Sequence, residues 1–249
     1  MFGLSPKLPL PEEQRKWVDR GFERLTKLLG RQRMLDAKLI LPDDEYFPDP
    51  YDGSKSGVVA MAERVATYMG VPRETFVVEI FAEGEDAWRE ALPVGRPESH
   101  DAAGLYLHKL EEERRVIGVH AKGLKDPLAL AATLAHELAH AILLGGKLLD
   151  PNAVDMEPMT DLCTVFLGMG FFTASSAFQF KQWTSNRTQG WSWERKGYLS
   201  EELWAYALAR FAFERGDRKP DWAKQLPTNI RGYFTRSAAW LEKHGGRIE

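Results

Sequence analysis

One segment of this sequence combines residue types and a spacing that suit metal chemistry. His136-Glu-Leu-Ala-His140 places two histidines four residues apart within an apolar stretch. On an α-helix such residues lie one turn apart on the same face, so both imidazoles can reach one ion. Glu137 is turned about 100° from His136 around the axis, so it borders the metal without competing as a ligand. There it can accept a proton from a water molecule whose pKa the metal lowers toward ~7. The pattern predicts a zinc site with Glu137 as general base.

A second interpretation of this segment needs no metal. The two histidines could be hydrogen-bonded residues of the core, with Glu137 facing solvent. A capped, apolar helix normally excludes two histidines and a glutamate from its middle, because burying unpaired polar groups is costly. We therefore favour the metal site.

A catalytic zinc usually takes three protein ligands and keeps one position for water. The remaining histidines are poorly placed in the sequence to supply the third ligand: His100, His108, His120 and His244. The carboxylates shortly after the motif are better candidates: Asp150, Asp155, Glu157 and Asp161.

Glu157 is the preferred third ligand because of its place before an apolar helical run, Leu162 to Phe172. A first-turn position on a neighbouring helix could present its carboxylate to the metal. Asp161 comes one turn later, where it could accept a hydrogen bond from the far nitrogen of a ligand histidine. Both residues also have a simpler interpretation, since acidic residues favour helix N-termini in general.

His136-Glu-Leu-Ala-His140 followed by Glu157-Pro-Met-Thr-Asp161 resembles the gluzincin metallopeptidases, whose pattern is HExxH and then ExxxD. The resemblance extends over roughly residues 116–172 and suits a compact, mini-gluzincin-like enzyme. It implies that Glu137 is the general base and that Glu157 is the third zinc ligand. It also implies that Asp161, outside the coordination sphere, is hydrogen-bonded to a ligand of the zinc. The metzincin pattern HExxHxxGxxH is absent, because His140 is followed by Ala-Ile-Leu-Leu-Gly-Gly-Lys147.

Peptide hydrolysis at such a site also needs a group that stabilises the developing oxyanion. Tyr198 is the candidate that we name for this role, with Arg195 and His120 as further possibilities. Each of the three also has a structural or surface interpretation.

The elements around the motif can be placed from their patterns. Pro11–Leu29 has apolar residues at helical spacing and is followed by Gly30, and 57–69 is a second helix that ends at Gly70. Between them lies an acidic, proline-broken loop, 41–54, whose carboxylates lack the spacing of a calcium loop. Asp126 is a natural N-cap for the motif helix, Pro127 suits its first position, and Gly145-Gly146 ends it.

Strand-like runs precede the motif helix. Thr75–Phe81 is rich in β-branched and aromatic residues, and Gly104–Leu110 and Val116–His120 flank a charged tip as in a hairpin. We expect Val116–His120 to be an exposed edge strand to which an extended peptide could add.

These elements predict an α+β, zincin-like fold. A small mixed sheet of about three or more strands would pack on the active-site helix, with mainly helical N- and C-terminal parts. We expect a helical N-terminal extension over 1–72, a catalytic core over 73–180 and a helical C-terminal part over 181–249.

The composition narrows the classes of partner. A formal net charge of −3 over 249 residues gives no basic face for nucleic acid. Cys163 is the only cysteine, which excludes an internal disulfide and a cysteine-ligated zinc finger.

The apolar stretch Pro127–Leu144 is shorter than the ~20 residues of a spanning helix and contains the motif, so we expect a buried helix rather than a membrane span. No secretory signal is evident at the N-terminus, and a cytoplasmic location is the default expectation.

The sequence therefore predicts a zinc-dependent metallohydrolase with one zinc per chain, most simply a peptidase acting on peptide or protein substrates. An alternative is a regulatory or catalytically inactive zincin-fold protein that recognises one protein partner. A third hypothesis is a helical scaffold in which HExxH is accidental. None of the three fixes an oligomeric state.

Overall fold

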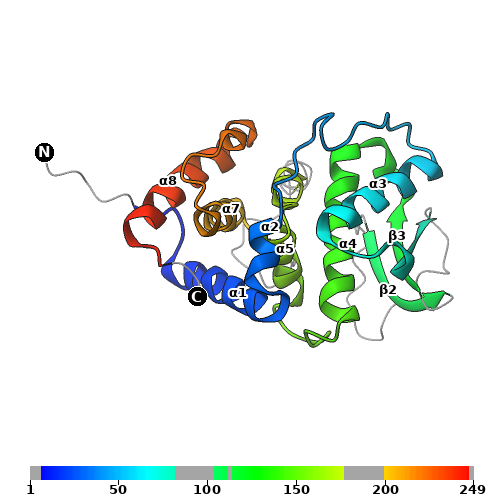
Figure 1. Cartoon of the computed structure of the whole chain (residues 1–249), viewed down its shortest axis with the longest axis horizontal. Coiled ribbons are helices and arrows are strands. Elements are labelled where there is room, and N and C mark those ends of the chain that lie inside the picture. The colour runs from blue at the N-terminus through cyan, green and yellow to red at the C-terminus, as the bar shows by residue number, and fades with distance from the viewer. Residues whose placement is uncertain (1–6, 82–103, 112–113, 177–198, 247–249) are drawn as a thin grey trace, which may run out of the picture. The chain divides into compact units, whose positions relative to one another are not determined.

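The computed structural model describes residues 7–81, 104–111, 114–176 and 199–246 (Figure 1). They form a mixed, mainly helical structure with a small sheet, which confirms the α+β class. The chain divides into two compact units, Met1–Leu41 with Asn152–Glu249 and Pro42–Pro151. The expected boundaries near residues 72 and 180 stay predictions.

The sheet belongs to the unit Pro42–Pro151. Its described strands are β1 (Phe76–Phe81), β2 (Gly104–Glu111) and β3 (Arg114–His120), in the order β1-β3-β2. β2 and β3 pair antiparallel, which confirms the predicted hairpin, and the register shifts between Leu107 and Leu110. β1 pairs with β3 in parallel, so the sheet is mixed as expected.

The prediction that Val116–His120 is an edge strand is wrong. β3 lies between β1 and β2 and pairs with both, and its residues Val116, Ile117 and Val119 are almost completely buried. The error has a physical cause, since the second neighbour of a hairpin strand comes from a distant part of the chain that local patterning does not identify. Among the described strands, β1 and β2 form the edges of the sheet.

Two helices cover one face of the sheet. α3 (Lys55–Met69) begins at Ser54, whose side chain accepts from the Gly57 N–H, and ends at the left-handed Gly70. α4 (Pro127–Gly145) is the motif helix. The two helices contact each other, while α3 also contacts β1 and α4 contacts β2 and β3, so they lie side by side on the strands (Figure 1).

α4 is the one helix among the described residues that is long and apolar enough to span a membrane by length and composition. Of its most apolar window, 61% is buried inside the structure. The core helix of a soluble protein passes the same test, and α4 contacts α3 and the sheet. That α4 is a buried helix rather than a membrane span stays a prediction.

The second unit, Met1–Leu41 with Asn152–Glu249, is helical in its described part. Its helices are α1 (Glu12–Leu29), α2 (Arg31–Asp36), α5 (Met156–Phe166), α7 (Glu201–Arg215) and α8 (Thr228–His244). Short 3₁₀ turns complete the two units: η1 (Arg73–Thr75), η3 (Ala121–Lys125) and η5 (Asp221–Gln225). α1 ends at Gly30, as predicted, with a φ of 86° that favours glycine.

The expected helical run Leu162–Phe172 is interrupted. α5 ends at Phe166, and a separate helical segment covers 170–176. Gly168 separates them, with a φ of 87° and an ideal Cβ position only 1.9 Å from the Lys38 carbonyl oxygen. Its own carbonyl accepts from the Ile40 N–H at 2.9 Å. Only glycine fits this close approach, which local apolar patterning does not reveal.

α1, α5 and α7 contact one another and enclose the core of this unit. Phe22 on α1 and Phe166 on α5 are fully buried, with ring centroids 6.1 Å apart. Trp204 on α7 is also almost completely buried.

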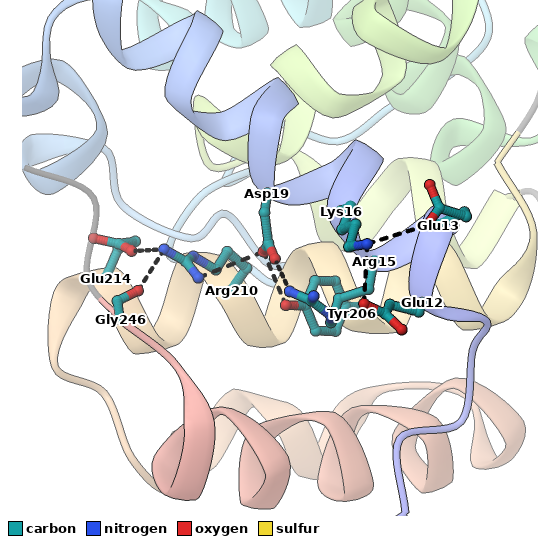
Figure 2. Close-up of polar contacts among 9 residues, drawn as sticks. All are labelled: Glu12, Glu13, Arg15, Lys16, Asp19, Tyr206, Arg210, Glu214 and Gly246. Atoms are coloured by element: carbon teal, nitrogen blue, oxygen red, sulfur yellow. Dashed lines mark hydrogen bonds and ion pairs between the residues drawn. The ribbon is translucent and has the colours of Figure 1, made fainter.

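A buried polar network joins α1 to α7 (Figure 2). Asp19 Oδ1 accepts from the Tyr206 hydroxyl at 2.9 Å and from Arg210 Nη1 at 3.4 Å, and Oδ2 accepts from Arg15 at 2.6 Å. Arg210 also donates to Glu214 Oε1 at 2.6 Å and to the carbonyl of Gly246 at 2.7 Å. One guanidinium therefore links α1, α7 and the chain that follows α8.

Burial raises the pKa of Tyr206, and the charge of Asp19 raises it further. The phenol therefore stays protonated and donates to the carboxylate. Arg210 and Glu214 are 5% and 1% exposed, so their pairing is essential, because an isolated buried charge is costly.

We expect Arg210→Met to destabilise the protein by roughly 3–5 kcal/mol, because it leaves the buried Glu214 carboxylate without its main partner. The effect should fall toward the lower end, since Arg31 Nη2 remains 3.6 Å from the other oxygen of Glu214. Urea unfolding measures the change. Lys224→Met, which removes the exposed pair with Asp221, is the matched control and should leave the midpoint unchanged. Equal midpoints for the two variants would contradict the role given to the network.

Candidate metal centre

The start of α4 fixes where its histidines stand. Asp126 caps the helix, and its Oδ1 accepts from the N–H groups of Leu128 and Ala129 at 3.0 Å each. Pro127 follows at the first helical position, as the sequence predicts. The helix then runs without interruption through His136 and His140 and ends at the predicted glycines.

The two motif histidines lie together on α4. Their ring centroids are 4.8 Å apart and their planes are inclined by 81°. His140 is only 2% exposed, and His136 is half-buried. Two imidazoles one helical turn apart can direct one nitrogen each toward a common ion.

The third member of the group is Glu157, in the first turn of α5. One ligand atom from each of His136, His140 and Glu157 lies within 4.8 Å of the other two, and this group could hold a metal ion. Ligand atoms around a tetrahedral zinc stand about 3.4 Å apart, as bond lengths of about 2.0–2.2 Å require.

Two imidazoles and a carboxylate suit several divalent metals, and zinc is among those that they bind well. Within the part of the chain that the structure describes, no other set of three histidine, cysteine or acidic side chains gathers in this way. The structure therefore brings together the three residues that the sequence proposes as ligands. That each of them binds a metal stays a prediction.

The local sequence explains why Glu157 can stand at the start of α5. Asp155 occupies the N-cap position, and Glu157 and Pro158 follow in the first turn. The first N–H groups of a helix have no partner within it, so proline is tolerated there and acidic residues are favoured.

Glu137 follows His136 on α4 and is 5% exposed. The helical geometry puts it next to the two imidazoles without making it part of their face. That Glu137 acts as the general base stays a prediction.

Asp161, the expected outer partner of the site, is 2% exposed. Its Oδ2 accepts from the backbone N–H of Leu199 at 3.3 Å, directly before α7. The sequence did not predict this contact, which connects segments 38 residues apart. Asp161 therefore helps to hold α5 and the start of α7 together, and its action on a ligand histidine stays a prediction.

The candidates for oxyanion stabilisation stand as follows. Tyr198 and Arg195 lie outside the described residues. His120 ends β3, where its ring stands edge-on to Phe81 at 5.2 Å and its Nδ1 accepts from the Lys122 N–H at 3.0 Å. These contacts give His120 a structural part in the turn that leads to α4, and its catalytic part is untested.

Of the remaining histidines, the structure describes the side chains of His120 and His244, and neither belongs to the group. His244 lies on α8 and stacks on Trp240, with ring centroids 5.0 Å apart. His108 lies in β2, and His100 is outside the described residues.

The acidic loop before α3 uses its carboxylates locally. Asp43 accepts from the N–H groups of Glu45 and Tyr46, Asp49 pairs with Arg64, and Asp52 accepts from the Ser54 N–H. These contacts shape turns and begin a helix, in keeping with the expected loop rather than a calcium site.

Cys163 lies on α5 and is fully buried. Burial raises the pKa of its thiol to about 12. Since a metal ligand must be the thiolate, the sulfur stays protonated and packs as a small apolar group.

Comparison with models of protein families, with curated proteins and with solved structures finds no match to this chain. The resemblance to gluzincins therefore rests on the two short motifs and on the group that their residues form.

We expect the purified full chain, without a histidine tag, to bind about one zinc per molecule. His140→Ala should abolish stoichiometric binding, and Glu157→Ala should weaken it, because each removes one ligand of the group. Elemental analysis after dialysis against zinc buffers measures the content. His244→Ala, on an exposed histidine of α8, is the control and should bind as the parent does. Zinc binding that survives both ligand substitutions would contradict this assignment.

Proposed function

We propose that this chain is a zinc-dependent metallohydrolase, a compact gluzincin-type peptidase. The observation that carries the proposal is the group His136, His140 and Glu157, with the buried Glu137 next to the first histidine on α4. The donor set leaves room for water or a substrate oxygen beside three protein ligands, which is the arrangement of catalytic rather than structural zinc sites.

The fold supports the same proposal at a coarser level. A strand directly before the motif helix, packed against that helix in a mixed sheet, is what a zincin-like fold would have. β3 leads through η3 into α4, and α4 contacts β2 and β3.

In this mechanism, His136, His140 and Glu157 would hold the metal. A bound zinc would polarise the scissile carbonyl and lower the pKa of the attacking water. Glu137 would take the proton from that water and then give it to the leaving amine, so one carboxylate serves as base and acid in turn.

A peptide or protein is the substrate class that we propose, with zinc as the single cofactor and the cytoplasm as the location. The formal net charge of −3 does not favour nucleic acid as a partner.

We expect Glu137→Gln to keep zinc and to lose peptide turnover by about 10²–10⁴-fold, because the amide has the same shape but cannot accept the proton. Cleavage of a peptide library by the zinc-loaded chain, followed by mass spectrometry, measures turnover. Glu242→Gln, an exposed residue of α8, is the matched control and should cleave as the parent does.

Parent-level cleavage by the zinc-loaded Glu137→Gln variant would disprove the assignment of the base. A parent protein that binds zinc but cleaves nothing in the library, and instead acts on or binds one protein, would favour the regulatory alternative. Zinc content and turnover are measured on the same preparation, so these outcomes are distinguishable.

A further inference from the structure

α1 contacts one face of α5 along its length. At the start of α5, Arg24 Nη1 lies 3.8 Å from Asp155 Oδ2. In the middle, Gly21 meets Met159 and Leu162, and near the end Phe22 meets Phe166. Arg24 thus faces the start of α5, while Gly21, which comes earlier in α1, faces its middle. The two helices therefore run roughly antiparallel there.

The contact at Gly21 is unusually close. An ideal Cβ at Gly21 would lie 2.3 Å from Leu162 Cδ2 and 3.4 Å from Met159 Sδ. The first distance is far below the ~3.5–4.0 Å of carbon atoms in contact. Leu162 has little freedom to move away, because Phe22 and Phe166 are also fully buried and the core is close-packed. Glycine inside a helix lowers its stability relative to alanine, so this residue suits close packing rather than helix formation.

Glu157 stands on the other side of α5. Successive helical residues are about 100° apart, so Met159, Leu162 and Phe166 share one face. By the same rotation Glu157 points about 170° away from the centre of that face. Any shift of α5 away from α1 therefore moves the Glu157 carboxylate in the direction in which it points.

We infer that Gly21 is a positioning residue for the metal site: by letting α1 pack at close range on one face of α5, it sets where α5 presents Glu157 on the opposite face. The inference rests on the proposed function, in which Glu157 is a zinc ligand. It gives α1, which carries neither of the two motifs, a role in metal affinity. Arg24 assists through Asp155, two residues before the ligand.

The test is the zinc affinity of Gly21→Ala in the full chain, measured by competition with a chelating dye. The measurement is made at a temperature well below the midpoint of thermal unfolding of the variant. We expect affinity to fall about tenfold or more, as for residues that orient metal ligands from outside the coordination sphere. Gly232→Ala is the matched control, since Gly232 lies in the exposed part of α8 and a Cβ there meets nothing within 4 Å. It makes the same chemical change and should leave affinity unchanged.

A double-mutant cycle separates positioning from a general loss of stability. In a Glu157→Ala background, Gly21→Ala should weaken the residual affinity no further, because the ligand that it positions is gone. The same loss in both backgrounds would show that Gly21 acts on the fold as a whole, and it would overturn the inference.

If Gly21→Ala does not fold, Arg24→Ala decides, since this side chain is partly exposed. We expect a loss of affinity of roughly two- to fivefold, the size that an exposed ion pair supports. Arg20→Ala, on an exposed arginine of the same helix, is its control. Unchanged affinity in Arg24→Ala would overturn the inference.

The failures of the inference and of the proposed function are distinguishable. A parent chain that binds no zinc overturns both. A parent chain whose zinc affinity falls with Glu157→Ala but not with Gly21→Ala overturns only the role of Gly21.

Discussion

The cost of burying ionisable side chains in an apolar helix is the constraint on which the proposed site depends. α4 is apolar for most of its length, yet Glu137 and His140 are 5% and 2% exposed. Polar groups taken out of water must find compensating interactions, or the fold loses stability. In the proposed function, His136 and His140 on this helix would hold a metal ion together with Glu157. The same helix must therefore serve packing and chemistry, and its cap and its flanking elements fix its position.

The second unit shows how the helix that carries Glu157 is held. α5 is a short helix of 11 residues, and helices of this length owe most of their stability to packing. α1 covers one face, α7 contacts it, and Asp161 joins it to Leu199 before α7. α1 and α7 are in turn linked by the buried Asp19–Tyr206–Arg210 network. The helix that carries Glu157 is thus packed into the helical core of its unit.

Short motifs carry the functional argument, since no family, curated protein or solved structure matches the chain. HExxH alone is brief enough to arise by chance. Its weight increases because it lies on a capped and buried helix, and because Glu157 joins the two histidines within 4.8 Å.

The sequence alone determined the features that depend on neighbours along the chain. Local rules of capping, periodicity and spacing predict these features. They are the β2–β3 hairpin, the α+β class, the three candidate ligands, the helix start at Asp126 and the helix ends at Gly30, Gly70 and Gly145. Tertiary structure alone decided the features that join distant segments. β3 became the central strand because β1 pairs with it in parallel, and α5 ended at Phe166 because Gly168 packs against the backbone of Lys38. Gly21, Leu199 and the Asp19 network belong to the same class. Their partners lie far away in the sequence, and long-range packing leaves no periodic signal in the residues that it brings together.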